Sequence, residues 1–109
     1  MKELPIACDM TALNAEQRER QQVLMKNFHA SIQETDGLDD GYAFRMEADA
    51  ATILAAAEFI TIERLCCPFL TFELAVGAAG DPLRLKVSGR AGVKEFIEAE
   101  FGVGLKGQS

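Results

Sequence analysis

The sequence predicts an α+β protein, a two-layer sandwich in which a mainly antiparallel four-stranded sheet is covered on one face by three helices. Two observations predict this class. Every segment with a strand pattern has one apolar and one polar face, which is typical of an antiparallel sheet covered on one side. The segments follow one another in the order β-α-β-α-β-β-α, which suits helices packed on a single sheet. We assign residues 1–104 to one domain and predict that 105–109 form a frayed tail.

Four segments have the two-residue period of a strand: residues 4–10, 42–47, 70–76 and 83–87. In the first of them the alternation places Cys8 on the apolar face. Pro5 lacks a backbone N–H, which suits the start or the edge of a strand. The acidic stretch 34–41 ends in Asp40-Gly41, a turn signal, and is predicted to be a loop.

Three segments are predicted to be helices: residues 15–33, 50–66 and 91–101. Asn14 followed by Gln17 resembles a capping box at the start of the first helix. Its opening turns, from Glu16 to Gln22, are polar, and we expect them to project into solvent or to meet a second subunit. Asp49 can cap the second helix, and Pro68 ends it because the residue before a proline is disfavoured in the helical region.

Composition excludes several classes of function. The chain of 109 residues has a formal net charge of −6, which repels nucleic acid and anionic lipid. No apolar run approaches the roughly 20 residues needed to span a bilayer, and the N-terminus has no signal-peptide pattern. We therefore expect a cytoplasmic protein with reduced cysteines and without nucleic-acid or membrane partners. The three cysteines are an odd number, which argues against a disulfide framework.

The stretch Glu63-Arg64-Leu65-Cys66-Cys67-Pro68 is the candidate site. Residues three and four positions apart share one face of a helix, so Glu63, Cys66 and Cys67 are expected to lie close together. Two thiolates and a carboxylate can form three sides of a tetrahedral zinc site. Two thiolates alone suit a softer ion such as Cu(I) or Hg²⁺.

The position of Cys66 and Cys67 on the helix favours metal binding over thiol redox chemistry. Reactive cysteines usually lie at the N-terminus of a helix, where the dipole stabilises a thiolate. These two lie at the C-terminus, where a cation is favoured. A third interpretation is that they only pack in the core, since cysteine is among the most buried residue types.

Two further residues could complete a site. Cys8 is placed on the apolar face of the first predicted strand, and His29 lies on the first helix. Each also has a structural explanation, as a small buried hydrophobic residue and as a partly exposed helix residue. His29 has no nucleophilic partner at a recognisable spacing, so we predict no catalytic residues and no enzyme.

Four stretches of the sequence together resemble a family of small bacterial proteins. They are Pro5-Ile6-Ala7-Cys8, residues 13–18, residues 40–45 and residues 63–69, the last containing Glu-Arg-x-Cys-Cys-Pro-Phe. The family has no assigned activity but is associated with heavy-metal resistance. The resemblance therefore points to Cys8, Glu63, Cys66 and Cys67 as one candidate set of site residues.

The sequence thus predicts a cytoplasmic metal-handling protein that binds zinc, Cu(I) or mercury. Cys66 and Cys67 would be ligands, Glu63 a third ligand or a base beside them, and Cys8 a further ligand. There are two alternatives. One is a non-catalytic interaction module with structural cysteines, which would form a homodimer through the start of the first helix, and the other is a thiol redox protein.

Overall fold

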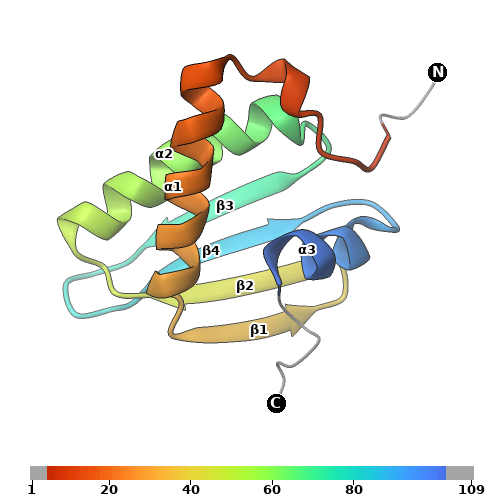
Figure 1. Ribbon diagram of the computed structural model, residues 1–109. Coiled ribbons are helices and arrows are strands. Elements are labelled where there is room, and N and C mark those ends of the chain that lie inside the picture. The colour runs from red at the N-terminus through yellow and green to blue at the C-terminus, as the bar shows by residue number, and fades with distance from the viewer. Residues whose placement is uncertain (1–4, 103–109) are drawn as a thin grey trace.

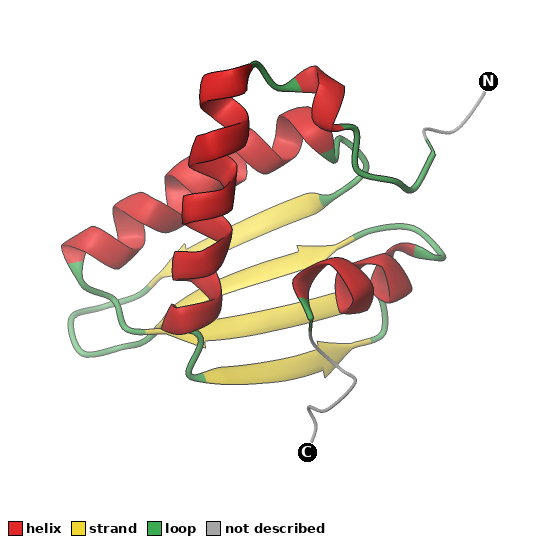
Figure 2. Cartoon of the chain, in the orientation of Figure 1, coloured by secondary structure: helices red, strands yellow, loops and turns green. Residues whose placement is uncertain are grey.

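A four-stranded antiparallel sheet with all three helices on one face forms the protein (Figure 1; Figure 2). The computed structural model describes residues 5–102. Their elements are a short 3₁₀ helix η1 (Met10–Ala12), helices α1 (Ala15–Ser31), α2 (Ala50–Cys66) and α3 (Val93–Phe101), and strands β1 (Glu34–Leu38), β2 (Gly41–Met46), β3 (Thr71–Val76) and β4 (Leu83–Ser88). The predicted fold class and architecture are confirmed.

The strand order in the sheet is β1-β2-β4-β3, and each neighbouring pair is antiparallel. Two hairpins, β1–β2 and β3–β4, therefore lie side by side, joined through α2. In the central pair Phe44 lies opposite Leu85 and Tyr42 opposite Val87. These side chains face the helices. Arg45 and Arg84, which lie opposite each other in the same pair of strands, face away from them.

The predicted first strand, residues 4–10, is wrong. Within its described part, residues 5–9 have no regular structure and Met10 begins η1. The alternation is real, because Ile6, Cys8 and Met10 are partly buried and the residues between them are exposed. However, Asp9 caps a 3₁₀ turn with its side chain, so the segment packs on the core without joining the sheet.

The fourth strand is β1, which was predicted to be an acidic loop. Leu38 pairs with Gly41, so Asp39 and Asp40 form a two-residue hairpin turn. The turn signal was therefore correct, but the strand before it was missed because nearly all of it is exposed and it has no apolar face. Acidic residues on such an edge strand also discourage pairing with another chain.

The two long helices begin at the predicted caps. The Asn14 side chain accepts a hydrogen bond from the Gln17 backbone N–H, and the Gln17 side chain accepts one from the Asn14 N–H, which completes the capping box. The Asp49 side chain accepts from the Thr52 N–H at the start of α2. Pro68 then limits the end of α2, while α1 ends at Ser31, two residues before its predicted end.

An aromatic cluster joins the helices to the sheet. It contains one phenylalanine from each of α1, β2, α2 and α3, namely Phe28, Phe44, Phe59 and Phe101. The ring centroids of Phe28 and Phe59 are 4.9 Å apart, and those of Phe28 and Phe44 are 5.1 Å apart. Four elements are thus fixed relative to one another, including the helix that carries the candidate site.

Helices of the described region lack the combination of length and apolar character that crossing a membrane requires. The tail predicted over residues 105–109 lies outside the described residues.

Candidate metal centre

The last turn of α2 holds Cys66 and Cys67 in place. The helix ends at Cys66, and Cys67 is its C-cap with a non-helical backbone conformation, as Pro68 requires. The Cys67 N–H still donates to the carbonyl of Glu63 over 2.7 Å, so the turn remains closed. The helical spacing from Glu63 to Cys67 is therefore kept, as the sequence predicted.

The N-terminal segment brings Cys8 to this helix end. The backbone N–H of Asp9 donates to the Cys66 carbonyl over 2.9 Å. That carbonyl belongs to the last turn of α2, where backbone acceptors lack partners within the helix. This hydrogen bond thus gives an acceptor at the end of the helix a partner, and it fixes the position of Cys8 beside Cys66 and Cys67.

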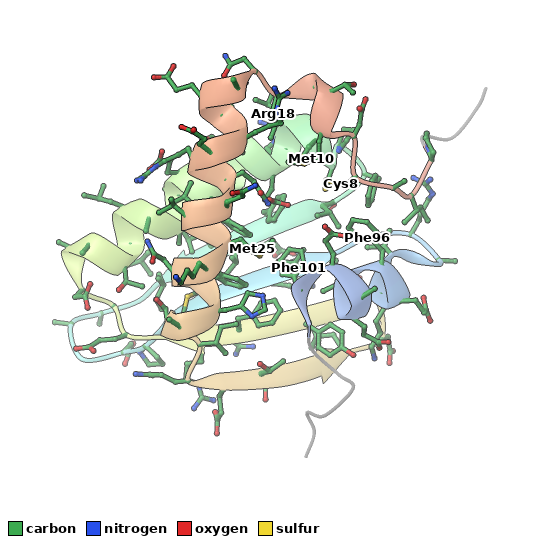
Figure 3. The ribbon with its side chains drawn as sticks, in the orientation of Figure 1. Cys8, Met10, Arg18, Met25, Phe96 and Phe101 are labelled. Atoms are coloured by element: carbon green, nitrogen blue, oxygen red, sulfur yellow. The ribbon has the colours of Figure 1, made fainter. Side chains whose placement is uncertain are left out.

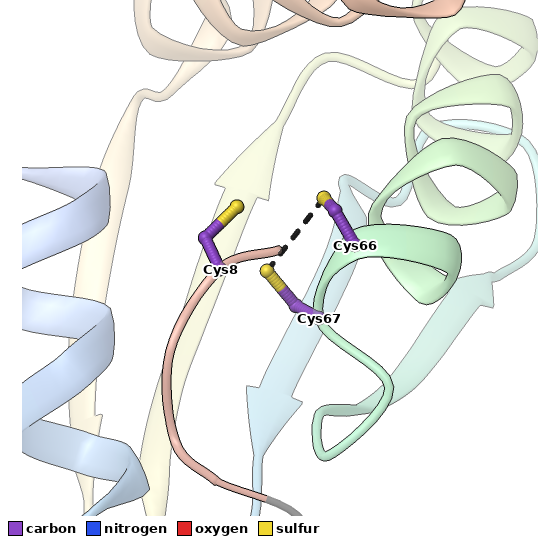
Figure 4. A group of neighbouring side chains, drawn as sticks. All are labelled: Cys8, Cys66 and Cys67. Carbon is purple, nitrogen blue, oxygen red and sulfur yellow. Dashed lines mark hydrogen bonds between the residues drawn. The ribbon is translucent and has the colours of Figure 1, made fainter. Parts of the chain in front are cut away.

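The three cysteine sulfurs converge (Figure 4). The Sγ atoms of Cys66 and Cys67 are 3.8 Å apart, and all three Sγ atoms lie within 4.8 Å of one another. Cys66 and Cys67 are fully buried and Cys8 is partly buried. Sulfurs on one metal ion with bonds of about 2.3 Å are separated by roughly 3.8–4.0 Å, so only a small contraction is needed.

Glu63 lies on the same turn and is fully buried. Its Oε2 accepts a hydrogen bond from the Gln21 Nε2 of α1 over 2.9 Å. Its Oε1 is buried without a hydrogen-bond partner among the residues described. A buried carboxylate oxygen without a partner is costly and is uncommon in proteins. This oxygen is therefore an available acceptor or ligand beside the thiols.

The thiols influence one another strongly. Burial raises the pKa of Cys8 to about 12. The Cys66 thiol and burial raise the pKa of Cys67. Cys66 differs, because hydrogen bonding from Cys67 lowers its pKa against the effect of burial. A single thiolate in this pair is therefore stabilised by the neighbouring thiol that stays protonated.

Burial also raises the pKa of Glu63, against the hydrogen bond from Gln21. A raised pKa in the folded state means that the unfolded chain loses its proton first as the pH rises. Glu63 therefore lowers stability at pH values above the ordinary range for glutamate. This sign is opposite to that of an ordinary paired carboxylate.

Glu63→Gln is expected to remove this loss. In metal-free protein, the free energy of unfolding of the variant should increase relative to that of the original chain as the pH rises from about 4 to about 8. This range covers ordinary and raised carboxyl pKa values. Urea denaturation at several pH values measures this increase. The exposed Glu73→Gln serves as the control. A difference that does not change with pH would show that Glu63 titrates normally.

The structure brings three of the predicted site residues together. Cys8, Cys66 and Cys67 form the one group of three or more possible metal ligands found among residues 5–102. Glu63 adjoins the group, since it acts on the pKa values of Cys66 and Cys67. His29 is exposed and lies near Gly102 at the end of α3, so it is not part of the cluster.

Two residues at the site were missed by the sequence reasoning. Gln21 was grouped with the polar opening turns of α1, but it is buried and holds Glu63. Its position three residues before Leu24, on the buried stripe of the helix, was the available signal. Met10 is the second, because its Sδ accepts a hydrogen bond from the Cys8 thiol over 3.4 Å (Figure 3).

Comparison of the chain with protein-family models, curated proteins and solved structures finds no match.

Proposed function

We propose that this protein binds a soft or borderline metal ion, Zn²⁺, Cu(I) or Hg²⁺, through Cys8, Cys66 and Cys67. The observation that carries the proposal is the convergence of three sulfurs from two distant parts of the chain. Packing alone does not require three thiols to meet at one point. Thiolates are the ligands that soft ions prefer, and zinc accepts them readily.

The environment of the cluster supports a cation. The carbonyl groups at the end of α2 give this end of the helix a partial negative charge. Glu63 adds a carboxylate whose Oε1 has no partner among the described residues. For a four-coordinate ion such as zinc, we propose that this oxygen supplies a fourth ligand or accepts a proton from a thiol. Gln21 would orient it, as partners of ligands commonly do.

A metal-handling protein must exchange its ion, and the cluster is asymmetric in a way that suits exchange. Cys66 and Cys67 are buried on a helix, whereas Cys8 is partly buried on a segment without regular structure. We propose that the ion enters and leaves on the Cys8 side. Reduced thiols are required, which agrees with a cytoplasmic location.

The alternatives have less support. Thiol redox chemistry is favoured by the lowered pKa of Cys66, but both Cys66 and Cys67 are buried away from a redox partner. A homodimer through the start of α1 would use a surface on which two residues already bind α2. Arg20 forms a two-pronged ion pair with Glu58, and Gln21 binds Glu63.

Native mass spectrometry of protein purified without a metal-affinity tag tests the proposal. We expect one zinc, copper or mercury ion per chain, and loss of that ion in Cys66→Ser and Cys67→Ser. Circular dichroism must show that the variants remain folded, and the serine variant of exposed Ala57 provides a control for the substitution. Absence of every ion, or binding that survives in both cysteine variants, would refute the proposal.

A further inference from the structure

The site holds three thiols that can become thiolates, and the Met10 thioether beside Cys8 is a neutral and weaker donor. In the described part of the chain, the group of His, Cys, Asp and Glu ligand atoms that lie within 4.8 Å of one another comprises Cys8, Cys66 and Cys67. Glu63 is adjacent to this group but does not belong to it. A ligand that requires three sulfurs and nothing else would therefore use the cluster as it stands.

The charges around the cluster restrict which ligand is stable there. Glu63 is fully buried on the same helical turn as Cys66 and Cys67, and the backbone carbonyls at the end of α2 carry a partial negative charge. A divalent ion on three thiolates keeps one net negative charge, and a monovalent ion keeps two. Placing that charge in a buried site beside Glu63 and the end of α2 is costly.

A trivalent centre avoids this cost, because three thiolates neutralise it. We propose that the cluster binds a trivalent, three-coordinate metalloid hydroxide of the arsenite class. This inference rests on the proposed function, since it uses the same three cysteines, but it specifies a different kind of ligand. Such a centre is pyramidal, with three bonds on one side and a lone pair on the other, and it needs no fourth ligand.

The reaction is a ligand exchange without oxidation or reduction. One As(OH)₃ reacts with three thiols to give As(SR)₃ and three waters. Three As–O and three S–H bonds break, and three As–S and three O–H bonds form, while arsenic stays in the trivalent state. Reactants and products are neutral, so no counter-charge is needed in the buried site. Exclusion of water from Cys66 and Cys67 then opposes the reverse reaction.

Native mass spectrometry with sodium arsenite tests the coordination. We expect an adduct with one arsenic gained and three hydrogens lost per chain. In Cys8→Ser and Cys8→Ala, we expect the affinity to fall by roughly 100-fold or more, the scale on which an added intramolecular contact raises affinity. An adduct that retains a hydroxyl, or equal affinity in folded Cys8 variants, would show that the vicinal pair acts alone and would overturn the inference.

Glu63→Gln separates this ligand from a four-coordinate metal ion. Arsenite affinity should be kept or increased in the variant, because a negative charge is removed and no ligand is lost. A zinc site that uses Oε1 should be weakened. If zinc, copper or mercury binds and arsenite does not, the inference fails and the proposed function stands. If none of the four binds, both fail.

Discussion

Phe44→Ala is expected to lower the free energy of unfolding by about 3–5 kcal/mol, the usual cost of removing a buried phenylalanine side chain. Phe44 is completely buried on the central strand β2. Its ring contacts Phe28 of α1 and Phe101 of α3, so the cavity would open where three elements meet. Favourable ring–ring contacts, about 0.5–1.5 kcal/mol per pair, would be lost as well.

A loss of this size is a large part of the 5–15 kcal/mol that stabilises a typical domain. Urea denaturation measures it, and Phe72→Ala is the matched control. Phe72 is only partly buried on the edge strand β3, where water and neighbouring side chains can relax into the space. We expect its loss to be clearly smaller. Equal losses for the two variants would contradict the arrangement of the core.

Most of the fold was predictable because its elements carry strong local signals. Helix α2 was predicted over its exact range, since Asp49 caps its start and Pro68 limits its end. The hairpin β3–β4 follows from alternation, and across it Glu73 pairs with Lys86, with 3.4 Å between Nζ and Oε2. These features depend on residues that are close in sequence.

The two mistakes have a common physical cause. A two-residue period reports which side chains are buried, and it does not report whether the backbone pairs with a strand. Residues 5–10 alternate in burial but use their backbone to form a turn and to meet the Cys66 carbonyl. Strand β1 pairs with β2 along its whole length but has almost nothing to bury. Only the tertiary structure distinguishes these cases.

The site was predictable to a similar extent. Helical spacing brings Glu63, Cys66 and Cys67 together without further information. The approach of Cys8 was expected for the wrong reason, a neighbouring strand, and depends instead on the hydrogen bond between Asp9 and Cys66. The role of Gln21 could not be read from α1 alone, because its partner belongs to another helix.

Binding of a metal or metalloid through all three cysteines is expected to raise the free energy of unfolding by about 2.7 kcal/mol at a ligand concentration 100 times Kd, and by about 4.1 kcal/mol at 1,000 times Kd. The size of this increase in unfolding free energy depends mainly on whether Cys8 binds the ligand. Cys66 and Cys67 are adjacent in sequence, so they remain together in the unfolded chain and can still hold the ligand there. Binding to both states reduces the stabilisation. Cys8 is brought to them by folding, so its bond is made only in the folded state.

Thermal unfolding with and without saturating ligand therefore distinguishes a three-cysteine site from a two-cysteine site. The original chain should show a large upward shift in Tm, and Cys8→Ser should show little or none even where some ligand still binds. Exchange of the Asp9 amide hydrogen provides a second measurement, because this N–H bonds to the Cys66 carbonyl and lies next to Cys8. Ligand should slow that exchange in the original chain and not in Cys8→Ser. Similar shifts in both proteins would mean that Cys8 approaches the pair without binding, and the convergence of the three sulfurs would then be a feature of packing.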